Sequence, residues 1–167
     1  MSSIGSGFQP AQLAREFAAR DAKRRPSLGR KGVALLETVP LFNGLSRRHL
    51  RRIAGLADEA QFPAGRVIVQ TGSRGTAFYV IVEGTAKVLA GYSSRVLARL
   101  GPGDFFGELA LLDGGPRTAS VVAAEPLTAI RIQRAQFRKM LRSEPEVGLK
   151  ILEELAGRLR SRPAPTD

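Results

Sequence analysis

The sequence predicts an α+β fold in which an antiparallel β-barrel is flanked by N- and C-terminal helices. Between residues 61 and 132, short apolar or alternating runs are separated by turns rich in glycine and proline. Before and after this stretch, apolar residues recur at helical spacing. Many short strands separated by such turns are typical of an antiparallel sandwich or barrel.

Composition narrows the class of protein. A chain of 167 residues, 43% of them hydrophobic, is expected to form one domain with extensions. The absence of cysteine excludes disulfides and thiolate metal sites, and a single histidine, His49, excludes a zinc site built on several histidines. No apolar run approaches the roughly 20 residues that span a bilayer, and no secretory signal is visible, so we expect a cytoplasmic protein.

The formal charge of +11 is concentrated toward the N-terminus. Residues 1–33 carry seven Lys and Arg against two acidic residues. We expect residues 1–32 to form a basic, partly helical extension, with a helix over residues 10–25 that stops near Pro26. Such charge attracts nucleotides, nucleic acid or acidic lipid without naming a partner, and it is equally typical of a solvated surface.

The first helix next to the barrel is expected to begin after Ser46, a residue well suited to cap a helix N-terminus. One of its faces is apolar and would point inward, while the opposite face is rich in arginine and would be solvated. His49 is expected to be a surface residue of this helix. The inward residues are Leu50, Ile53, Ala54 and Ala57, and the outward ones are Arg47, Arg48, Arg51 and Arg52.

Helical spacing returns over residues 134–143 and 145–161, and we expect a disordered tail over residues 163–167. The apolar stripe of the last helix is wide enough to need a cover, which could be the barrel, a ligand or a second subunit. A homodimer through this helix and a helix folded back on its own barrel both remain open. The stripe consists of Val147, Leu149, Ile151, Leu152, Leu155, Ala156 and Leu159.

One segment carries the groups that a sugar phosphate needs. Gly107 permits a close approach of the backbone to a ligand. The next turn offers unpaired N–H groups of Leu109 and Ala110 to an anion, while the Glu108 carboxylate suits a sugar hydroxyl. Arg117 presents a planar fork of donors to phosphate oxygens, and Thr118 and the N–H of Ala119 add further donors.

These residues resemble the phosphate-binding cassette of cyclic-nucleotide-binding domains, in the sequence Phe-Gly-Glu-Leu-Ala (106–110) and, after a short loop, Pro-Arg-Thr-Ala-Ser-Val (116–121). The resemblance covers about residues 33–160, and we place the cyclic-nucleotide-binding domain at residues 33–162. It implies a jelly-roll-like double-stranded β-helix, with Glu108 on the ribose 2′-hydroxyl and Arg117 on the cyclic phosphate. The rest of the implied shell comprises Gly107, Leu109, Ala110, Thr118 and Ala119, with Val88 near the base and Leu155, Arg158 and Leu159 on a closing C-terminal helix.

The base is not fixed by the resemblance. Cyclic-GMP-dependent kinases carry a threonine after the cassette arginine, as Thr118 stands here, whereas cAMP-dependent kinase regulatory subunits carry alanine. Bacterial members with threonine or serine there often bind cAMP, and the Arg- and Ala-rich composition suggests a bacterial source. We therefore favour cAMP over cGMP as the ligand, with no separate cofactor.

Other functions remain alternatives. Glu108 and Arg117 could pair with each other in a barrel that binds no ligand. Relatives of the catabolite-activator type continue into a helix-turn-helix, for which the six residues after Ser161 leave no room, although the basic extension could contact nucleic acid through phosphates. No catalytic motif is visible, so we expect a sensor that acts on an effector protein of unknown identity, and not an enzyme.

Overall fold

The computed structural model describes residues 28–107, 115 and 117–160. Among these residues, three short helices precede the strands: α2 (Gly29–Glu37), the 3₁₀ helix η1 (Pro40–Phe42) and α3 (Arg47–Leu56). The strands are β1 (Ala57–Phe62), β2 (Val67–Val69), β3 (Ala77–Glu83), β4 (Ala86–Ala90), β5 (Val96–Leu100), β6 (Phe105–Phe106), β7 (Ala119–Ala123) and β8 (Leu127–Gln133). Helices α5 (Arg134–Ser143) and α6 (Pro145–Arg160) follow; α5 has the predicted bounds, and α6 begins at the predicted residue and continues to the end of the described chain.

The strands form two four-stranded antiparallel sheets. Sheet A has the order β1-β8-β3-β6, and sheet B has the order β2-β7-β4-β5. The predicted α+β class with flanking helices is confirmed, in a jelly-roll-like arrangement. Among the described residues the two sheets remain separate, so the architecture is a sandwich and not one closed barrel.

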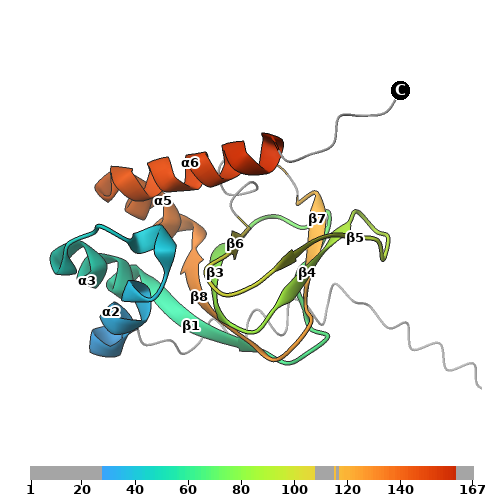
Figure 1. The fold of residues 1–167 in the computed structure, drawn as a ribbon, viewed down its shortest axis with the longest axis horizontal. Coiled ribbons are helices and arrows are strands. Elements are labelled where there is room, and N and C mark those ends of the chain that lie inside the picture. The colour runs from blue at the N-terminus through green and yellow to red at the C-terminus, as the bar shows by residue number, and fades with distance from the viewer. Residues whose placement is uncertain (1–27, 108–114, 116, 161–167) are drawn as a thin grey trace, which may run out of the picture.

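Two apolar cores explain the sequence of β3. Phe78 and Val80 face the helices, whereas Ala77, Tyr79 and Ile81 face sheet B. Because successive side chains of a strand point to opposite faces, a strand with both faces buried has an unbroken apolar run. Sheet A is therefore the middle layer, between the helices and sheet B, as Figure 1 shows.

Helix α3 begins as predicted, because the Ser46 side chain accepts a hydrogen bond from the His49 N–H. It ends at Leu56, so Ala57 opens β1 and the expectation that Ala57 lies in the helix is wrong. Ala57 is nevertheless buried as predicted, against the same helical core.

On the strand that Ala57 opens, Asp58 lies opposite Arg131 of β8. The Arg131 guanidinium donates two hydrogen bonds to the Asp58 carboxylate, at 3.1 and 2.8 Å. Both residues are buried, so this cross-strand ion pair joins the first and last strands inside the fold.

The N-terminal helices pack onto the domain. Leu28 donates its N–H to the carbonyls of Ala54 and Ala57 and packs against the helical core. Helix α2 spans the predicted boundary between the N-terminal extension (residues 1–32) and the domain (residues 33–162). Leu36 within this helix is fully buried. The helix predicted over residues 10–25 and the tail over residues 163–167 lie outside the described residues.

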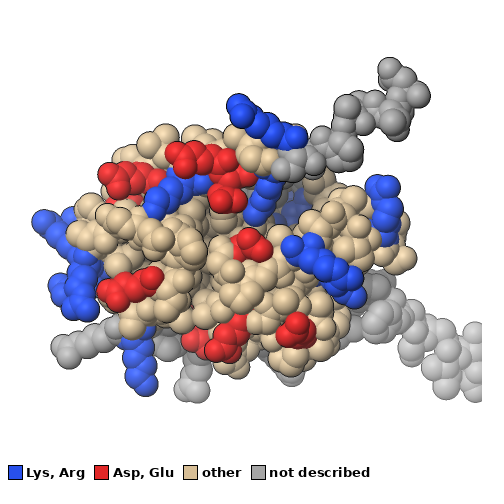
Figure 2. All heavy atoms as spheres, in the orientation of Figure 1, with Lys and Arg blue, Asp and Glu red and all other residues tan. Residues whose placement is uncertain are grey.

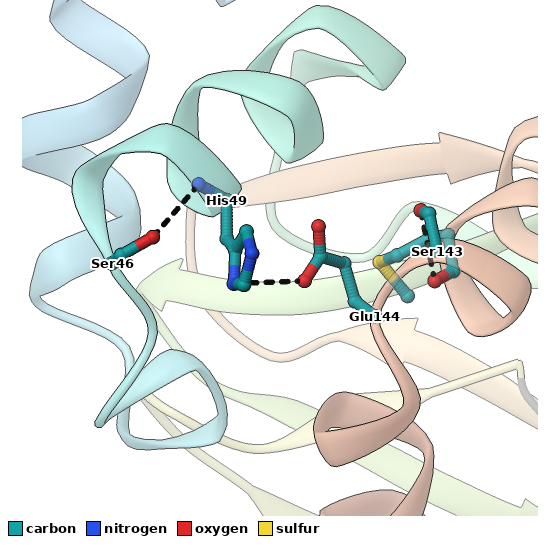
Figure 3. A network of polar contacts seen from close by, with 5 residues as sticks. Ser46, His49, Ser143 and Glu144 are labelled. Atoms are coloured by element: carbon teal, nitrogen blue, oxygen red, sulfur yellow. Dashed lines mark hydrogen bonds and ion pairs between the residues drawn. The ribbon is translucent and has the colours of Figure 1, made fainter.

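A buried carboxylate lies at the junction of α5 and α6. The Glu144 side chain is 2% exposed, and its Oε2 is 3.2 Å from Nδ1 of His49 on α3. Figure 3 shows the two side chains pointing toward each other across this junction. His49, expected to be a surface residue, is only partly exposed because it covers Glu144. Within the described residues, Oε1 of Glu144 has no hydrogen-bond partner.

Helix α6 crosses the top of the molecule in Figure 1, from the junction with α5 toward the strands. Val147 and Ile151 on one of its faces are buried in the helical core. Leu149, Leu152 and Leu159 of the same helix are exposed. Within the part of the chain that the structure describes, no helix is both long and apolar enough to cross a bilayer.

Charge is unevenly spread over the surface. Figure 2 shows Lys and Arg gathered at the end of the molecule formed by α3 and acidic side chains along α6. The α3 arginines predicted to be solvated are exposed, as are Glu146, Glu153 and Glu154 on α6.

Candidate functional site

Arg117 is buried at the end of the sandwich. It precedes β7 by two residues, so alternation places it on the same face as Ala119 and Val121, and Val121 belongs to the core between the sheets. Its side chain therefore points between the sheets, and Arg117 is 8% exposed. The guanidinium Nη2 donates to the carbonyl of Ala77, at the start of β3, over 3.1 Å. A buried cation at the end of a sandwich is suited to receive an anion.

Gly107 lies against this guanidinium, although ten residues separate the two in sequence. Its φ of +92° is a conformation that L side chains rarely adopt. A Cβ atom at Gly107 would lie 2.7 Å from the Ala77 oxygen and 3.1 Å from Nη1 of Arg117. The chain can thus approach the guanidinium closely at this point only because residue 107 has no side chain.

The backbone of Arg117 is held by the loop between β2 and β3. The Gly72 N–H donates to the Arg117 carbonyl at 2.8 Å, and the Arg117 N–H donates to the Ser73 carbonyl at 2.9 Å. The glycine-rich sequence of this loop predicts only a turn. Because the contacts use backbone groups of residues more than 40 positions apart, no pattern of residue types pointed to them.

The inner face of sheet B next to Arg117 is apolar and only partly covered. Val88 on β4 lies opposite Val121 of β7 on one side and Ala98 of β5 on the other. Val88 is half-buried and Ala98 is exposed. Ala98 is not among the predicted site residues. It could have been found from Leu100, which packs on the core between the sheets, because residues two apart in a strand share one face.

The C-terminal end of α6 contacts the strand that leads into the cassette. Nη2 of Arg158 donates to the Phe105 carbonyl at 2.8 Å, and its Cζ lies 4.6 Å from the centroid of the Phe105 ring. Phe105 is two residues before Gly107. Of the other two predicted lid residues, Leu155 is half-buried against the helical core and Leu159 is 67% exposed.

The remaining predicted residues divide into two groups. Thr118, which is exposed, and Ala119, which is half-buried and begins β7, directly follow Arg117 in the chain. Glu108, Leu109 and Ala110 lie outside the described residues, and so does any contact between Glu108 and Arg117. Across residues 28–107, 115 and 117–160, no group of His, Cys, Asp and Glu residues could hold a metal ion.

Comparison with known proteins assigns the family. The model of the cyclic nucleotide-binding domain matches residues 59–144, about half of the chain, which include Gly107 and Arg117. The chain therefore belongs to the cyclic nucleotide-binding domain family. Over 108 residues it is 40% identical to the cAMP-dependent protein kinase regulatory subunit of Aspergillus fumigatus, and this match covers 65% of the chain but only 26% of that subunit.

Solved structures agree on the fold. The crystal structure of Thermus thermophilus catabolite activator protein superposes with a TM-score of 0.66 at 34% identity, over 72% of this chain and 58% of that one. The regulatory domain of Toxoplasma gondii PKA with cAMP gives 0.67 at 25% identity, over 77% of this chain and 49% of that one. These relatives are regulatory proteins of which the chain spans between a quarter and about three fifths.

Proposed function

We propose that this chain is a sensor module that binds cAMP between the open end of sheet B and the cassette. The buried guanidinium of Arg117, hydrogen-bonded to Ala77 and pressed against Gly107, carries the proposal. In this role Arg117 binds the cyclic phosphate, Glu108 the ribose 2′-hydroxyl, and Val88 with Ala98 supports the base.

The choice of cAMP rests on the relatives. The fungal subunit is named as cAMP-dependent, and the Toxoplasma domain was solved with cAMP. Thr118 is exposed and follows Arg117 directly, so its hydroxyl could add a hydrogen bond to the phosphate that Arg117 would bind. Cyclic GMP is the competing ligand, and we propose that it binds more weakly.

We propose that the output of the module is movement of α6. Arg158 joins the end of α6 to Phe105, two residues before Gly107, so a ligand that binds at the cassette would change the contacts of this helix. A ligand that binds one position of α6 more tightly shifts the population toward that position. In this scheme the module performs no catalysis and acts in the cytoplasm on an effector protein.

A second copy of the chain is the partner we propose for α6. Leu149, Leu152 and Leu159 are 58%, 59% and 67% exposed, and the helical repeat places them on one side of α6, outside the face that buries Val147 and Ile151. Large apolar side chains gathered on one helix face mark association surfaces. A dimer formed there would place the moving helix of each sensor against that of its partner.

Calorimetry with cAMP and cGMP side by side tests the site and the base preference together. Arg117→Ala should weaken cAMP binding by at least about tenfold, because a charge-assisted contact to the phosphate is lost. Arg99→Ala is the matched control, since Arg99 is an exposed arginine of β5 opposite Lys87. Unchanged affinity in Arg117→Ala would refute the role of Arg117, and tighter binding of cGMP would refute the base preference.

A further inference from the structure

Behind Arg117 lies a pair of hydroxyl groups that the proposed site does not use. Oγ1 of Thr71 and Oγ of Ser120 are 2.8 Å apart, and the Thr71 N–H donates to Oγ of Ser120 at 2.9 Å. Oγ1 of Thr71 also donates to the Gly91 carbonyl at 2.7 Å. A hydroxyl group has one proton, and that of Thr71 is donated to the Gly91 carbonyl. In the contact between the two hydroxyls, Ser120 is therefore the donor and Thr71 the acceptor.

These bonds join three separate parts of sheet B. Thr71 belongs to the loop between β2 and β3, Ser120 to β7, and Gly91 to the turn between β4 and β5. The next two residues of the same loop, Gly72 and Ser73, hold the backbone of Arg117 through its carbonyl and its N–H. The position of Arg117 therefore depends on a loop that the Thr71–Ser120 pair anchors.

The pair cannot itself reach a ligand between the sheets. Ala119 and Val121 point toward the inner face of β7, so Ser120 between them points to the outer face. Ser120 is nevertheless buried, because the loop carrying Thr71 covers it. Any effect of these hydroxyls on a bound nucleotide must therefore pass through the backbone that they hold.

We propose that Thr71 and Ser120 form a clamp that positions Arg117 for the cyclic phosphate and ties it to the β4–β5 hairpin. That hairpin carries Val88 and Ala98, so the clamp sets the spacing between the phosphate-binding and base-supporting parts of the site. The inference rests on the proposed function, and it assigns positioning roles to two residues outside the binding shell.

The test combines binding with a double-mutant cycle. Thr71→Val and Ser120→Ala each remove one hydroxyl and should each weaken cAMP binding by about tenfold in calorimetry, whereas Thr71→Ser keeps the hydroxyl and should bind like the wild type. In an Arg117→Ala background the same two changes should have little further effect, because their route to the ligand is gone. A merely structural role would weaken binding equally in both backgrounds.

Thr85→Val is the matched control, because it removes a threonine hydroxyl that donates a hydrogen bond to the exposed Glu125, in the turns at the other end of the sheet. Amide exchange without ligand gives a second readout: loss of the clamp should speed exchange at Gly72 and Arg117. Ser120→Ala serves alone if Thr71→Val does not fold.

The outcomes separate the two proposals. Wild-type protein that binds neither cyclic nucleotide overturns the proposed function and, with it, the role given to the clamp. Wild-type protein that binds cAMP overturns the clamp alone if Ser120→Ala binds equally tightly, if its loss persists in the Arg117→Ala background, or if Gly72 and Arg117 exchange at unchanged rates.

Discussion

At Gly107 two physical demands meet: a left-handed backbone and a space too small for a methyl group. The φ of +92° is strained for any L residue, and the Ala77 carbonyl would lie 2.7 Å from a Cβ. The same atom accepts a hydrogen bond from Arg117. A side chain at residue 107 would therefore disturb the guanidinium as well as the local backbone.

Gly107→Ala should lower the free energy of unfolding by about 2 kcal/mol, from strain and crowding together, and should weaken cAMP binding through Arg117. Urea unfolding and calorimetry measure the two effects. Gly65→Ala is the matched control: Gly65 has a φ of +83°, and a methyl group there would meet no atom within 4 Å, so this variant isolates backbone strain. Equal losses of stability and unchanged binding in both variants would contradict the crowding argument.

Between elements, single polar contacts link the helices to one another and to the sheets. Glu144 at the α5–α6 junction is buried, and Nδ1 of His49 on α3 lies 3.2 Å from its Oε2. Removing one member of a buried pair leaves the other desolvated without compensation, whereas removing both is far less harmful.

His49→Ala should therefore lower the free energy of unfolding by about 1 kcal/mol, the value of a hydrogen bond to a charged group reduced for the partial exposure of the imidazole. The double variant with Glu144→Leu should be more stable than the sum of the single changes implies. Urea unfolding measures this coupling, with Arg48→Ala of the same helix as control. A coupling of zero would mean that the contact does not contribute to holding α3 on the junction.

Arg158 links α6 to β6 in the same way. Arg158→Ala removes both its hydrogen bond to the Phe105 carbonyl and its contact with the Phe105 ring. We expect faster amide exchange over residues 155–160 and cAMP binding weakened roughly threefold to tenfold, since each contact contributes about 1 kcal/mol or less. Arg160→Ala, one exposed arginine further along, should change neither. Unaltered exchange in Arg158→Ala would contradict the link.

The positions of the helices and strands could be predicted from the sequence more completely than the contacts between them. The unbroken apolar run of β3 and the Ser46 cap are local signals, and both lead to the observed structure. Ala57 was misassigned because a buried alanine four residues after Ile53 suits a helix and a strand equally well. Gly107 and Arg117 stood out by type and spacing, and the structure brings them together.

The rest of the candidate site depends on pairings between distant residues. Ala98 belongs to the site only because β5 pairs with β4 in the observed register, which places it opposite Val88. Arg158 meets Phe105 only because α6 crosses above β6. The spacing of residues within one element predicts neither contact, because each depends on how one whole element packs against another.

At the scale of the whole molecule, the basic end around α3 and the exposed apolar face of α6 are separate surfaces. The α3 arginines lie along the exposed face of this helix, and such a basic surface favours no particular anion. The exposed leucines of α6 do indicate a partner. Removing apolar surface from water is favourable, and the same helix of a second copy presents an apolar surface that could cover them.

Leu152→Lys should convert a dimer into a monomer, measured by sedimentation over a range of concentrations. Burial of one leucine contributes about 2 kcal/mol, and a lysine there would also have to be desolvated, so the dissociation constant should rise by well over tenfold. Leu97→Lys is the matched control, because Leu97 is 52% exposed on β5, away from α6. A wild-type chain that stays monomeric, or a Leu152→Lys variant that still dimerises, would rule out this interface. If the interface holds, the same variant separates ligand binding from communication between subunits, because Leu152 is 59% exposed on α6 and is not one of the residues proposed to bind the nucleotide.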